Sequence, residues 1–184
     1  MNVILTGMRG TGKSSIGRQL AALLGYTFVD TDTRIEVLAG ARIADIVARH
    51  GWEHFRALER QVVARVAGGN TQVISTGGGT LIDPENATQL KAGGLVVLLV
   101  CDLAVLRRRI RGGTNRPSLT GNSSAIDELA QVWETRRAQY QTVADLTYDV
   151  SVESTNPLRD IQRKAAAVRD LLQNTPRFHS QHAR

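Results

Sequence analysis

Short apolar segments rich in β-branched residues alternate along the chain with longer segments of helical periodicity. The apolar segments are nearly continuous, which is typical of strands covered on both faces of a parallel sheet. Strands that alternate with helices predict an α/β fold, in which crossover helices connect parallel strands. The expected strands are residues 2–6, 27–30, 72–75, 95–101 and 146–150.

The helical segments carry apolar stripes that could pack on such a sheet. Apolar residues recur at helical spacing in the segment after the first strand and in a helix expected over residues 52–67. The stripes consist of Ile16, Leu20, Leu23 and Leu24 and of Phe55, Leu58, Val62 and Val66. Further helices are expected over residues 84–91, 103–110, 125–141 and 157–172.

Two segments lack this alternation. Residues 112–124 (GGTNRPSLTGNSS) have no periodicity and are rich in glycine and small polar residues, which predicts a mobile loop. Residues 174–184 are expected to form a flexible C-terminal tail. With 184 residues and no linker that divides them, the chain is expected to form one domain over residues 1–173.

Composition narrows the possible partners and the compartment. The net charge of +6 is compatible with nucleic acid or with small anionic ligands, but aromatic residues make up only 4% of the chain. Because no basic run is interleaved with aromatic residues, we favour small anions and expect no nucleic-acid partner. No segment is long and apolar enough for a membrane span, and residues 1–5 lack the features of a signal peptide. The single cysteine, Cys101, suits a reducing compartment, so we expect a cytoplasmic protein.

Residues 7–14 (GMRGTGKS) match the phosphate-binding pattern G-x-x-x-x-G-K-[ST]. The match lies between the first predicted strand and the first helix, which is the context that supports it. Glycines allow backbone amides to surround phosphates, and the helix N-terminus adds its positive dipole. Lys13 would supply a charge for the β- and γ-phosphates, and the Ser14 hydroxyl would be a magnesium ligand. The alternative is a glycine-rich turn with a chance lysine.

Asp30 and Asp32 follow the second predicted strand, at the end where a parallel sheet faces its ligand. One carboxylate could hold magnesium through water, while the other accepts a hydrogen bond from an acceptor hydroxyl. Helix capping is the alternative. However, residues 33–36 (TRIE) already form a capping-box pattern, so a helix start would not require both aspartates.

The remaining candidates are glycines after the third strand and dispersed arginines. Gly77–Gly79 could bring backbone amides close to a ligand or could form a plain turn. Arg56 could form a solvated ion pair with Glu59, three residues further on. Arg116 and Arg136 could clamp a carboxylate or phosphate, although each alone could be a surface residue. His50 and His54 have helical spacing, but Gly51 and the absence of a third ligand favour surface histidines.

In combination these motifs resemble the shikimate kinase family, and the resemblance extends from the P-loop to about Pro157. Arg109 also matches the arginine that covers the adenine side of the nucleotide in this family. The matching motifs are GMRGTGKS at 7–14, DTD at 30–32, F-R-x-x-E at 55–59, Gly77–Gly79, Arg116 with Pro117, Arg136 with Tyr140, and Thr155-Asn156-Pro157.

The resemblance implies a nucleoside-monophosphate-kinase-like fold. This is a single-domain, three-layer α/β/α P-loop fold with a central five-stranded parallel sheet and a mobile lid at about residues 112–124. It also implies a monomer that uses Mg²⁺ and ATP to phosphorylate the 3-hydroxyl of shikimate. The products would be shikimate 3-phosphate and ADP, in a step of chorismate and aromatic amino acid biosynthesis.

The family pattern assigns roles residue by residue. Lys13, Asp32 and Arg116 would be catalytic, and Ser14 and Asp30 would hold the metal, Asp30 through water. Shikimate would be bound by Asp32, Arg56, Gly78, Gly79 and Arg136. ATP would be bound by Gly10, Thr11, Gly12, Lys13, Ser14, Ser15, Arg109, Arg116, Asn156 and Pro157.

The chain departs from the family pattern at a few positions. Ser118 stands in the lid where leucine is usual, and Val47 stands where a bulkier apolar residue is expected. Arg137 beside Arg136 leaves the register ambiguous by one position, and the spacing to Tyr140 favours Arg136. A gluconate or nucleotide kinase and a non-catalytic sensor are the alternatives. Two arginines suited to one carboxylate favour an acid, and the retained lysine and aspartates favour catalysis.

Overall fold

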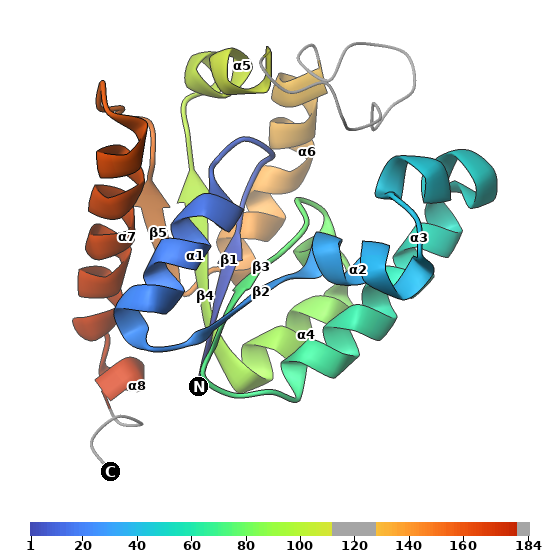
Figure 1. Ribbon diagram of the computed structural model, residues 1–184, viewed down its shortest axis with the longest axis horizontal. Coiled ribbons are helices and arrows are strands. Elements are labelled where there is room, and N and C mark those ends of the chain that lie inside the picture. The colour runs from blue at the N-terminus through green and yellow to red at the C-terminus, as the bar shows by residue number, and fades with distance from the viewer. Residues whose placement is uncertain (112–127, 180–184) are drawn as a thin grey trace.

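The computed structural model describes residues 1–111 and 128–179, which form a five-stranded parallel sheet with helices on both faces (Figure 1). The strand order is β2-β3-β1-β4-β5, so β1 is central. The predicted α/β fold is confirmed, and each strand end agrees with its prediction to within one residue. The strands are β1 Asn2–Thr6, β2 Thr27–Asp30, β3 Gln72–Ser75, β4 Gly94–Val100 and β5 Leu146–Asp149.

Helices connect the strands and cover both faces of the sheet. All the helices expected from periodicity are present; α2 was expected only from the capping-box pattern at residues 33–36, and α8 is additional. Among the described residues, none of the helices combines the length and apolar character that a membrane crossing requires. The helical elements are α1 Lys13–Leu24, α2 Thr31–Ala39, α3 Ile43–Ala67, η1 Thr80–Ile82, α4 Pro84–Gly93, α5 Leu103–Arg111, α6 Glu128–Val143, α7 Pro157–Gln173 and α8 Pro176–His179.

The strand residues alternate between two hydrophobic cores, one on each face of the sheet. Val3 and Leu5 of β1 pack with residues of α1 and α7, whereas Ile4 packs with residues of α3 and α4. Strand side chains point to opposite faces at each step, so an apolar run such as β1 can bury every residue only when helices cover both sides. All of β1 is buried. Helices therefore cover both faces of the sheet, and the polar loops lie at its carboxyl edge.

The start of α2 differs from the prediction. Asp30 is its N-cap, because the Asp30 carboxylate accepts hydrogen bonds from the amides of Asp32 and Thr33. The expected capping box is therefore wrong. The Glu36 carboxylate instead accepts a hydrogen bond from the amide of Ile43, 3.0 Å away, and so ties α2 to the start of α3. An aspartate that ends a strand can cap the next helix directly, and α2 therefore begins before the pattern at residues 33–36.

Helix α3 bends at Gly51, which has φ 78° and ψ 173°. The sequence predicted a helix from residue 52 and a boundary at Gly51, and the structure adds a helical segment before the kink. This backbone conformation is restricted almost entirely to glycine. The kink places Ile43 before it and Trp52 and Arg56 after it around one cavity.

The C-terminal segment also differs from the prediction. Residues 176–179 form α8 rather than part of a flexible tail, and Phe178 is only 5% exposed because it packs in the core beneath α1 and α7. The predicted lid at residues 112–124, with Arg116 and Ser118, lies outside the described residues. Helix α6 was predicted from residue 125, and its described part begins at Glu128.

The kink gives a test of the fold. Gly51→Ala should lower the free energy of unfolding by about 1–3 kcal/mol, because an alanine would be held in a conformation that only glycine tolerates. A β-carbon at Gly51 would meet no atom within 4 Å, so crowding does not contribute. Urea unfolding followed by circular dichroism measures the change.

Gly68→Ala is the matched control, because Gly68 follows the same helix but has an ordinary φ of −72°. Its β-carbon would also be uncrowded, with the Arg65 carbonyl oxygen 3.8 Å away. This control should lose no stability, since alanine restricts the unfolded chain. Equal losses in the two variants would mean that the Gly51 conformation is not the cause.

Candidate functional site

Two adjoining cavities lie at the carboxyl edge of the sheet. The first, here called the P-loop cavity, is lined by the P-loop, Asp30 and the end of β3. The second, here called the α3–α6 cavity, lies between α3, α6 and the loop at Gly77–Gly79. Arg9 and Asp32 line both cavities. Molecules bound in the two cavities would therefore meet at these two side chains.

The P-loop turns from β1 into α1 through backbone that requires glycine. A β-carbon at Gly7 would lie 2.3 Å from the Leu99 carbonyl oxygen, and Gly12 has φ 88° at the N-cap of α1. Lys13 reaches back over the loop, and its ammonium donates to the carbonyl oxygens of Gly7 and Met8, each 3.0 Å away. Backbone amides at a helix N-terminus, together with a lysine, form an anion site suited to phosphates.

Ser14, Asp30 and Ser75 bring three oxygen-bearing side chains together at one side of the P-loop cavity. The Ser14 hydroxyl donates to Asp30 Oδ2 at 2.7 Å and lies 3.3 Å from the Ser75 hydroxyl. The described residues contain no cluster of three or more His, Cys, Asp or Glu side chains placed to hold a metal. Mg²⁺ on a nucleotide needs only one or two protein carboxylates, so this oxygen set suits it. Ser75 was missed from the sequence.

Asp32 lies in the first turn of α2, at the junction of the two cavities. A β-carbon added to Gly77 would lie 2.8 Å from Asp32 Oδ1, so the carboxylate packs directly against the glycine loop. The two aspartates of the DTD motif therefore have different surroundings. Asp30 caps α2 and contacts Ser14, whereas Asp32 faces both cavities.

Arg56 lines the α3–α6 cavity and is held by a buried carboxylate. Its Nη1 lies 2.6 Å from Glu59 Oε2, and the Thr80 hydroxyl donates to the other Glu59 oxygen at 2.7 Å. Glu59 is only 1% exposed, so the pair is not the solvated one considered from the sequence. A β-carbon at Gly79 would lie 2.6 Å from Arg56 Nη2, so the guanidinium packs directly against this glycine.

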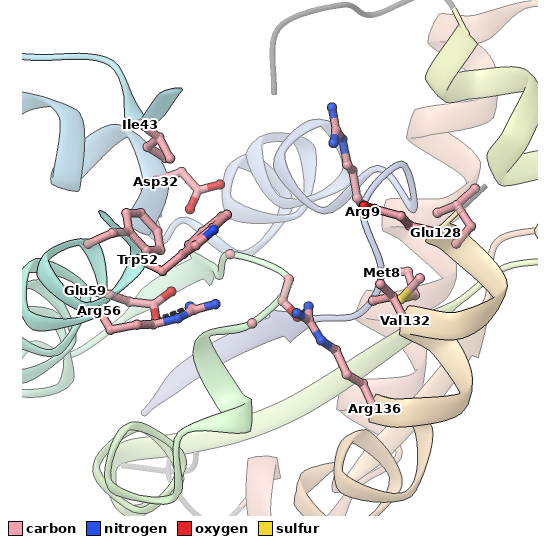
Figure 2. Close-up of a pocket in the computed structure, with 15 residues that line it drawn as sticks. Met8, Arg9, Asp32, Ile43, Trp52, Arg56, Glu59, Glu128, Val132 and Arg136 are labelled. Atoms are coloured by element: carbon pink, nitrogen blue, oxygen red, sulfur yellow. Dashed lines mark hydrogen bonds and ion pairs between the residues drawn. The ribbon is translucent and has the colours of Figure 1, made fainter. Parts of the chain in front are cut away.

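Arg136 reaches the same cavity from the opposite wall (Figure 2). Its Nη1 donates to the Gly78 carbonyl oxygen at 3.1 Å. Arg137 instead points outward, is 54% exposed and lies 3.9 Å from Glu134. Arg136 is thus the residue that lines the cavity, as the spacing to Tyr140 had favoured. The two guanidinium groups lie on opposite walls, and Glu59 pairs with only one of them, Arg56. Such an arrangement suits a small ligand with a carboxylate.

The sequence and the fold both match known shikimate kinases. A family model described as shikimate kinase matches residues 9–173. A shikimate kinase of Geobacter metallireducens is 44% identical over 83% of this chain and 84% of that protein. Another from Synechococcus elongatus is 39% identical over 95% of this chain and 90% of that protein.

A solved shikimate kinase from Acinetobacter baumannii, in complex with shikimate, superposes with a TM-score of 0.82. It is 31% identical, and the match covers 95% of this chain and 94% of that one. The chain belongs to the shikimate kinase family. The kinase activity expected from the P-loop and the expected five-stranded P-loop fold are therefore confirmed.

Beyond the family motifs, the α3–α6 cavity has an apolar lining that the sequence analysis did not assign to the site. Met8, Trp52 and Val132 line it, and Phe55 was counted only as part of a helix stripe. Apolar stripe residues give no sign of whether they face the core or a ligand. Glu128 and Arg9 were also missed, because they lie outside any motif position with a recognised role. Val47 packs with Ile43 and Ile46 rather than lining the cavity.

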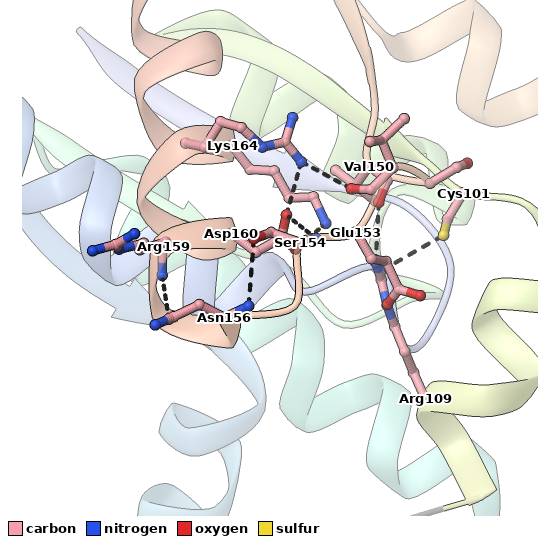
Figure 3. Close-up of polar contacts among 12 residues, drawn as sticks. Cys101, Arg109, Val150, Glu153, Ser154, Asn156, Arg159, Asp160 and Lys164 are labelled. Carbon is pink, nitrogen blue, oxygen red and sulfur yellow. Dashed lines mark hydrogen bonds and ion pairs between the residues drawn. The ribbon is translucent and has the colours of Figure 1, made fainter.

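The predicted nucleotide residue Arg109 joins three segments beside the P-loop (Figure 3). Its guanidinium donates to the carbonyl oxygens of Gly10 and Val150 at 3.3 and 3.0 Å. Its Nε lies 3.0 Å from Glu153, which also pairs with Arg108 at 2.9 Å. Hydrogen bonds from Arg108 and Arg109 lower the pKa of Glu153. Arg109 is therefore fixed next to the P-loop in this kinase.

Asn156 and Pro157, which the family pattern places beside ATP, also begin α7. The Asn156 side chain caps the helix by accepting a hydrogen bond from the Arg159 amide at 3.0 Å, and Pro157 occupies the first turn. The capping chemistry that ends the loop could have been read from the sequence as Asn-Pro. Their contact with ATP stays a prediction.

Asp160 anchors the same loop on α7 (Figure 3). Its carboxylate accepts hydrogen bonds from the Ser154 amide at 3.2 Å, from Arg163 at 2.7 Å and from Lys164. Burial alone would raise the pKa of Asp160, but hydrogen bonds from Lys164 and Arg163 outweigh it and lower that pKa. The loop that leads to Asn156 is therefore held by charge-assisted bonds.

The burial of Glu59 gives a test of the site. Glu59→Gln should lower the free energy of unfolding by about 1–3 kcal/mol, because it weakens charge-assisted hydrogen bonds in a dry environment. Urea unfolding measures the loss.

Asp45→Asn is the matched control, since Asp45 in the first turn of α3 forms an i,i+3 pair with Arg42 at the N-cap, and the two side chains are 42% and 74% exposed. An exposed pair contributes about 0–1 kcal/mol. A loss in Asp45→Asn as large as in Glu59→Gln would contradict the role given to burial.

Proposed function

We propose that the α3–α6 cavity binds shikimate and that the chain transfers the γ-phosphoryl group of ATP to its 3-hydroxyl. The products are shikimate 3-phosphate and ADP. The observation that carries the proposal is the placement of Arg56 and Arg136 on opposite walls of a cavity that shares Asp32 with the P-loop cavity. The α3–α6 cavity binds the acid, and the P-loop cavity binds the phosphates.

The carboxylate of shikimate is bound by Arg56 and Arg136. Planar guanidinium groups form paired hydrogen bonds with a carboxylate, which fixes the orientation of the acid as well as its charge. Glu59 keeps Arg56 in place from behind, at a distance of 2.6 Å. The apolar side chains of Met8, Trp52 and Val132 contact the carbon ring from the two sides of the cavity, and the backbone amides of Gly78 and Gly79 are further donors.

Asp32 orients the 3-hydroxyl and accepts its proton as the phosphoryl group transfers. Phosphoryl transfer has a loose transition state, so catalysis depends chiefly on position and on charge stabilisation. Lys13 leaves its contacts with the Gly7 and Met8 carbonyls to bind the β- and γ-phosphates. Its fixed charge then stabilises negative charge on the transferring group.

Ser14 and Asp30 are the residues proposed to hold Mg²⁺, Asp30 through a water molecule. Their oxygens, 2.7 Å apart, match the preference of this ion for hard ligands, and Ser75 adds a third hydroxyl nearby. When bound, the ion screens the charge between nucleotide phosphates. Capping by Asp30 fixes the carboxylate before any ion arrives, since its other oxygen is committed to α2.

Three further roles are proposed from the family pattern. Arg109 covers the adenine side of the nucleotide, and Asn156 with Pro157 forms the loop beside the base. Fixation of Arg109 by Gly10, Val150 and Glu153 supports the first role. Arg116 stabilises charge on the transferred phosphoryl group; it lies outside the described residues, and its role rests on the sequence motif alone.

We further propose that the enzyme works as a monomer in the cytoplasm. The monomer is what the resemblance to the shikimate kinase family implies. Cys101 is the only cysteine, which suits a reducing compartment.

The proposed activity predicts the choice of acceptor. Purified protein with Mg²⁺ and ATP should release ADP in the presence of shikimate, and mass spectrometry should detect shikimate 3-phosphate. Gluconate, which has no ring, and nucleoside monophosphates, which have no carboxylate, should support much slower turnover at equal concentration, because the cavity offers two arginines for one carboxylate and apolar side chains for a ring.

Lys13→Ala is the control for a contaminating kinase. Removal of one preorganised charge typically lowers the rate by about 10²–10³-fold, so this variant should be nearly inactive. Faster turnover with gluconate or a nucleoside monophosphate than with shikimate would overturn the substrate assignment. ADP release that the Lys13 variant retains would overturn the assignment of the active site.

A further inference from the structure

One face of α6 donates hydrogen bonds to the glycine loop of the α3–α6 cavity and to η1, which follows that loop. Arg136 Nη1 and the Tyr140 hydroxyl both donate to the Gly78 carbonyl oxygen, and Gln139 Nε2 donates to the Ile82 carbonyl oxygen at 2.6 Å. Spacings of three and four residues place these side chains on the same side of the helix. The glycine loop is thus attached to α6 through its backbone carbonyls.

Tyr140 is the fully buried member of this group. Its relative exposure is 0%, and its ring stacks on Trp133 with centroids 6.3 Å apart. Burial raises the pKa of Tyr140, and the nearby Arg136 offsets this only in part, so the phenol stays a neutral donor. The hydroxyl therefore has one fixed position, and that position is against the Gly78 carbonyl.

The other side of the glycine loop is attached elsewhere. The Gly77 amide donates to the Thr31 hydroxyl at 3.0 Å, and the Thr80 amide donates to the Gly77 carbonyl at 3.2 Å. Within residues 1–111 and 128–179, the amides of Gly78 and Gly79 donate to no other group. Gly78 and Gly79 are both among the residues that line the α3–α6 cavity.

Planarity of the peptide bond connects the two observations. In a trans peptide, the carbonyl of one residue and the N–H of the next point in opposite directions. No cis peptide is present in the described chain. Holding the Gly78 carbonyl toward α6 therefore turns the Gly79 N–H away from α6. A glycine pair has wide conformational freedom, so without such a restraint this peptide could rotate.

We propose that Tyr140 is a positioning residue for the acceptor. Its hydroxyl fixes the peptide between Gly78 and Gly79, so that the Gly79 amide is presented to the ligand without further ordering. The inference rests on the proposed function, since it takes the α3–α6 cavity as the acceptor site. Tyr140 itself contacts Gly78 rather than the acceptor.

The Tyr140 hydroxyl also allows Arg136 to turn from the Gly78 carbonyl oxygen to the carboxylate of the acid. Arg136 and Tyr140 share one carbonyl oxygen, which has two lone pairs. When Arg136 turns its fork to a carboxylate, Tyr140 keeps the Gly78 oxygen bonded. Without the hydroxyl, Arg136 would leave that oxygen unpaired, and an unpaired polar group in a closed site is unfavourable. Acceptor binding would then compete with the loop for Arg136.

The test is Tyr140→Phe, which keeps the ring and removes only the hydroxyl. The KM for shikimate should rise about 5- to 10-fold, as expected when one hydrogen bond is lost. The KM for ATP and kcat at saturating shikimate should stay within about twofold of the parent. Calorimetric titration of shikimate should show a matching loss of affinity in the absence of ATP.

Gln139→Met is the matched control, because it removes a hydrogen bond from the same face of α6 to the next part of the loop. Ile82, unlike Gly78, does not line the cavity. Its KM for shikimate should not change, although its thermal stability should fall as much as that of Tyr140→Phe. Measured melting temperatures then separate a general loosening from a positioning effect.

The outcomes are distinct. Tyr140→Phe with an unchanged KM for shikimate overturns the inference, and so does an equal rise in both KM values or in the Gln139 variant. If the parent protein neither binds nor phosphorylates shikimate, the proposed function fails first, and the inference fails with it. A rise confined to shikimate in Tyr140→Phe supports it.

Discussion

Parallel pairing of β2, β3 and β1 is the constraint on which the site depends. Asp30 is in register with Ser75, and Ser75 is in register with Leu5, two residues before the P-loop begins. Parallel strands lie about 4.8 Å apart, and all end at the same edge of the sheet. The side-chain oxygens of Asp30 and Ser75, the glycine loop and the P-loop therefore meet because of strand order alone. Antiparallel pairing at any of these positions would separate them.

Burial of polar side chains then holds parts of the site in place. Glu59 and Tyr140 are buried on opposite sides of the acceptor cavity, and each holds a neighbour in place, Arg56 on one side and Gly78 on the other. Rigid supports of this kind reduce the ordering that ligand binding requires. Asp32 is different, because it lines both cavities.

Much of the fold was predictable from local patterns. Five apolar strands, a P-loop between a strand and a helix, and arginines at family positions suffice to predict the sheet and the two binding regions. The errors came from competition between local solutions. Asp30 caps α2, so the capping-box pattern at residues 33–36 is not used. Phe178 packs in the core, which the composition of the C-terminal segment does not indicate. Tyr140 appeared in a motif, but its hydrogen bond to Gly78 depends on how α6 packs over the loop, which no sequence spacing gives.

The central claim is that Arg56 and Arg136 bind the acid, that the P-loop binds the phosphates of ATP, and that the two substrates meet at Asp32. A crystal structure with shikimate, ADP and Mg²⁺ tests it most directly. The carboxylate should lie between Arg56 and Arg136, and the 3-hydroxyl should lie within hydrogen-bonding distance of Asp32, on the side of the P-loop. A carboxylate bound away from these arginines, or a ring turned so that the 3-hydroxyl faces away from Asp32, would contradict it.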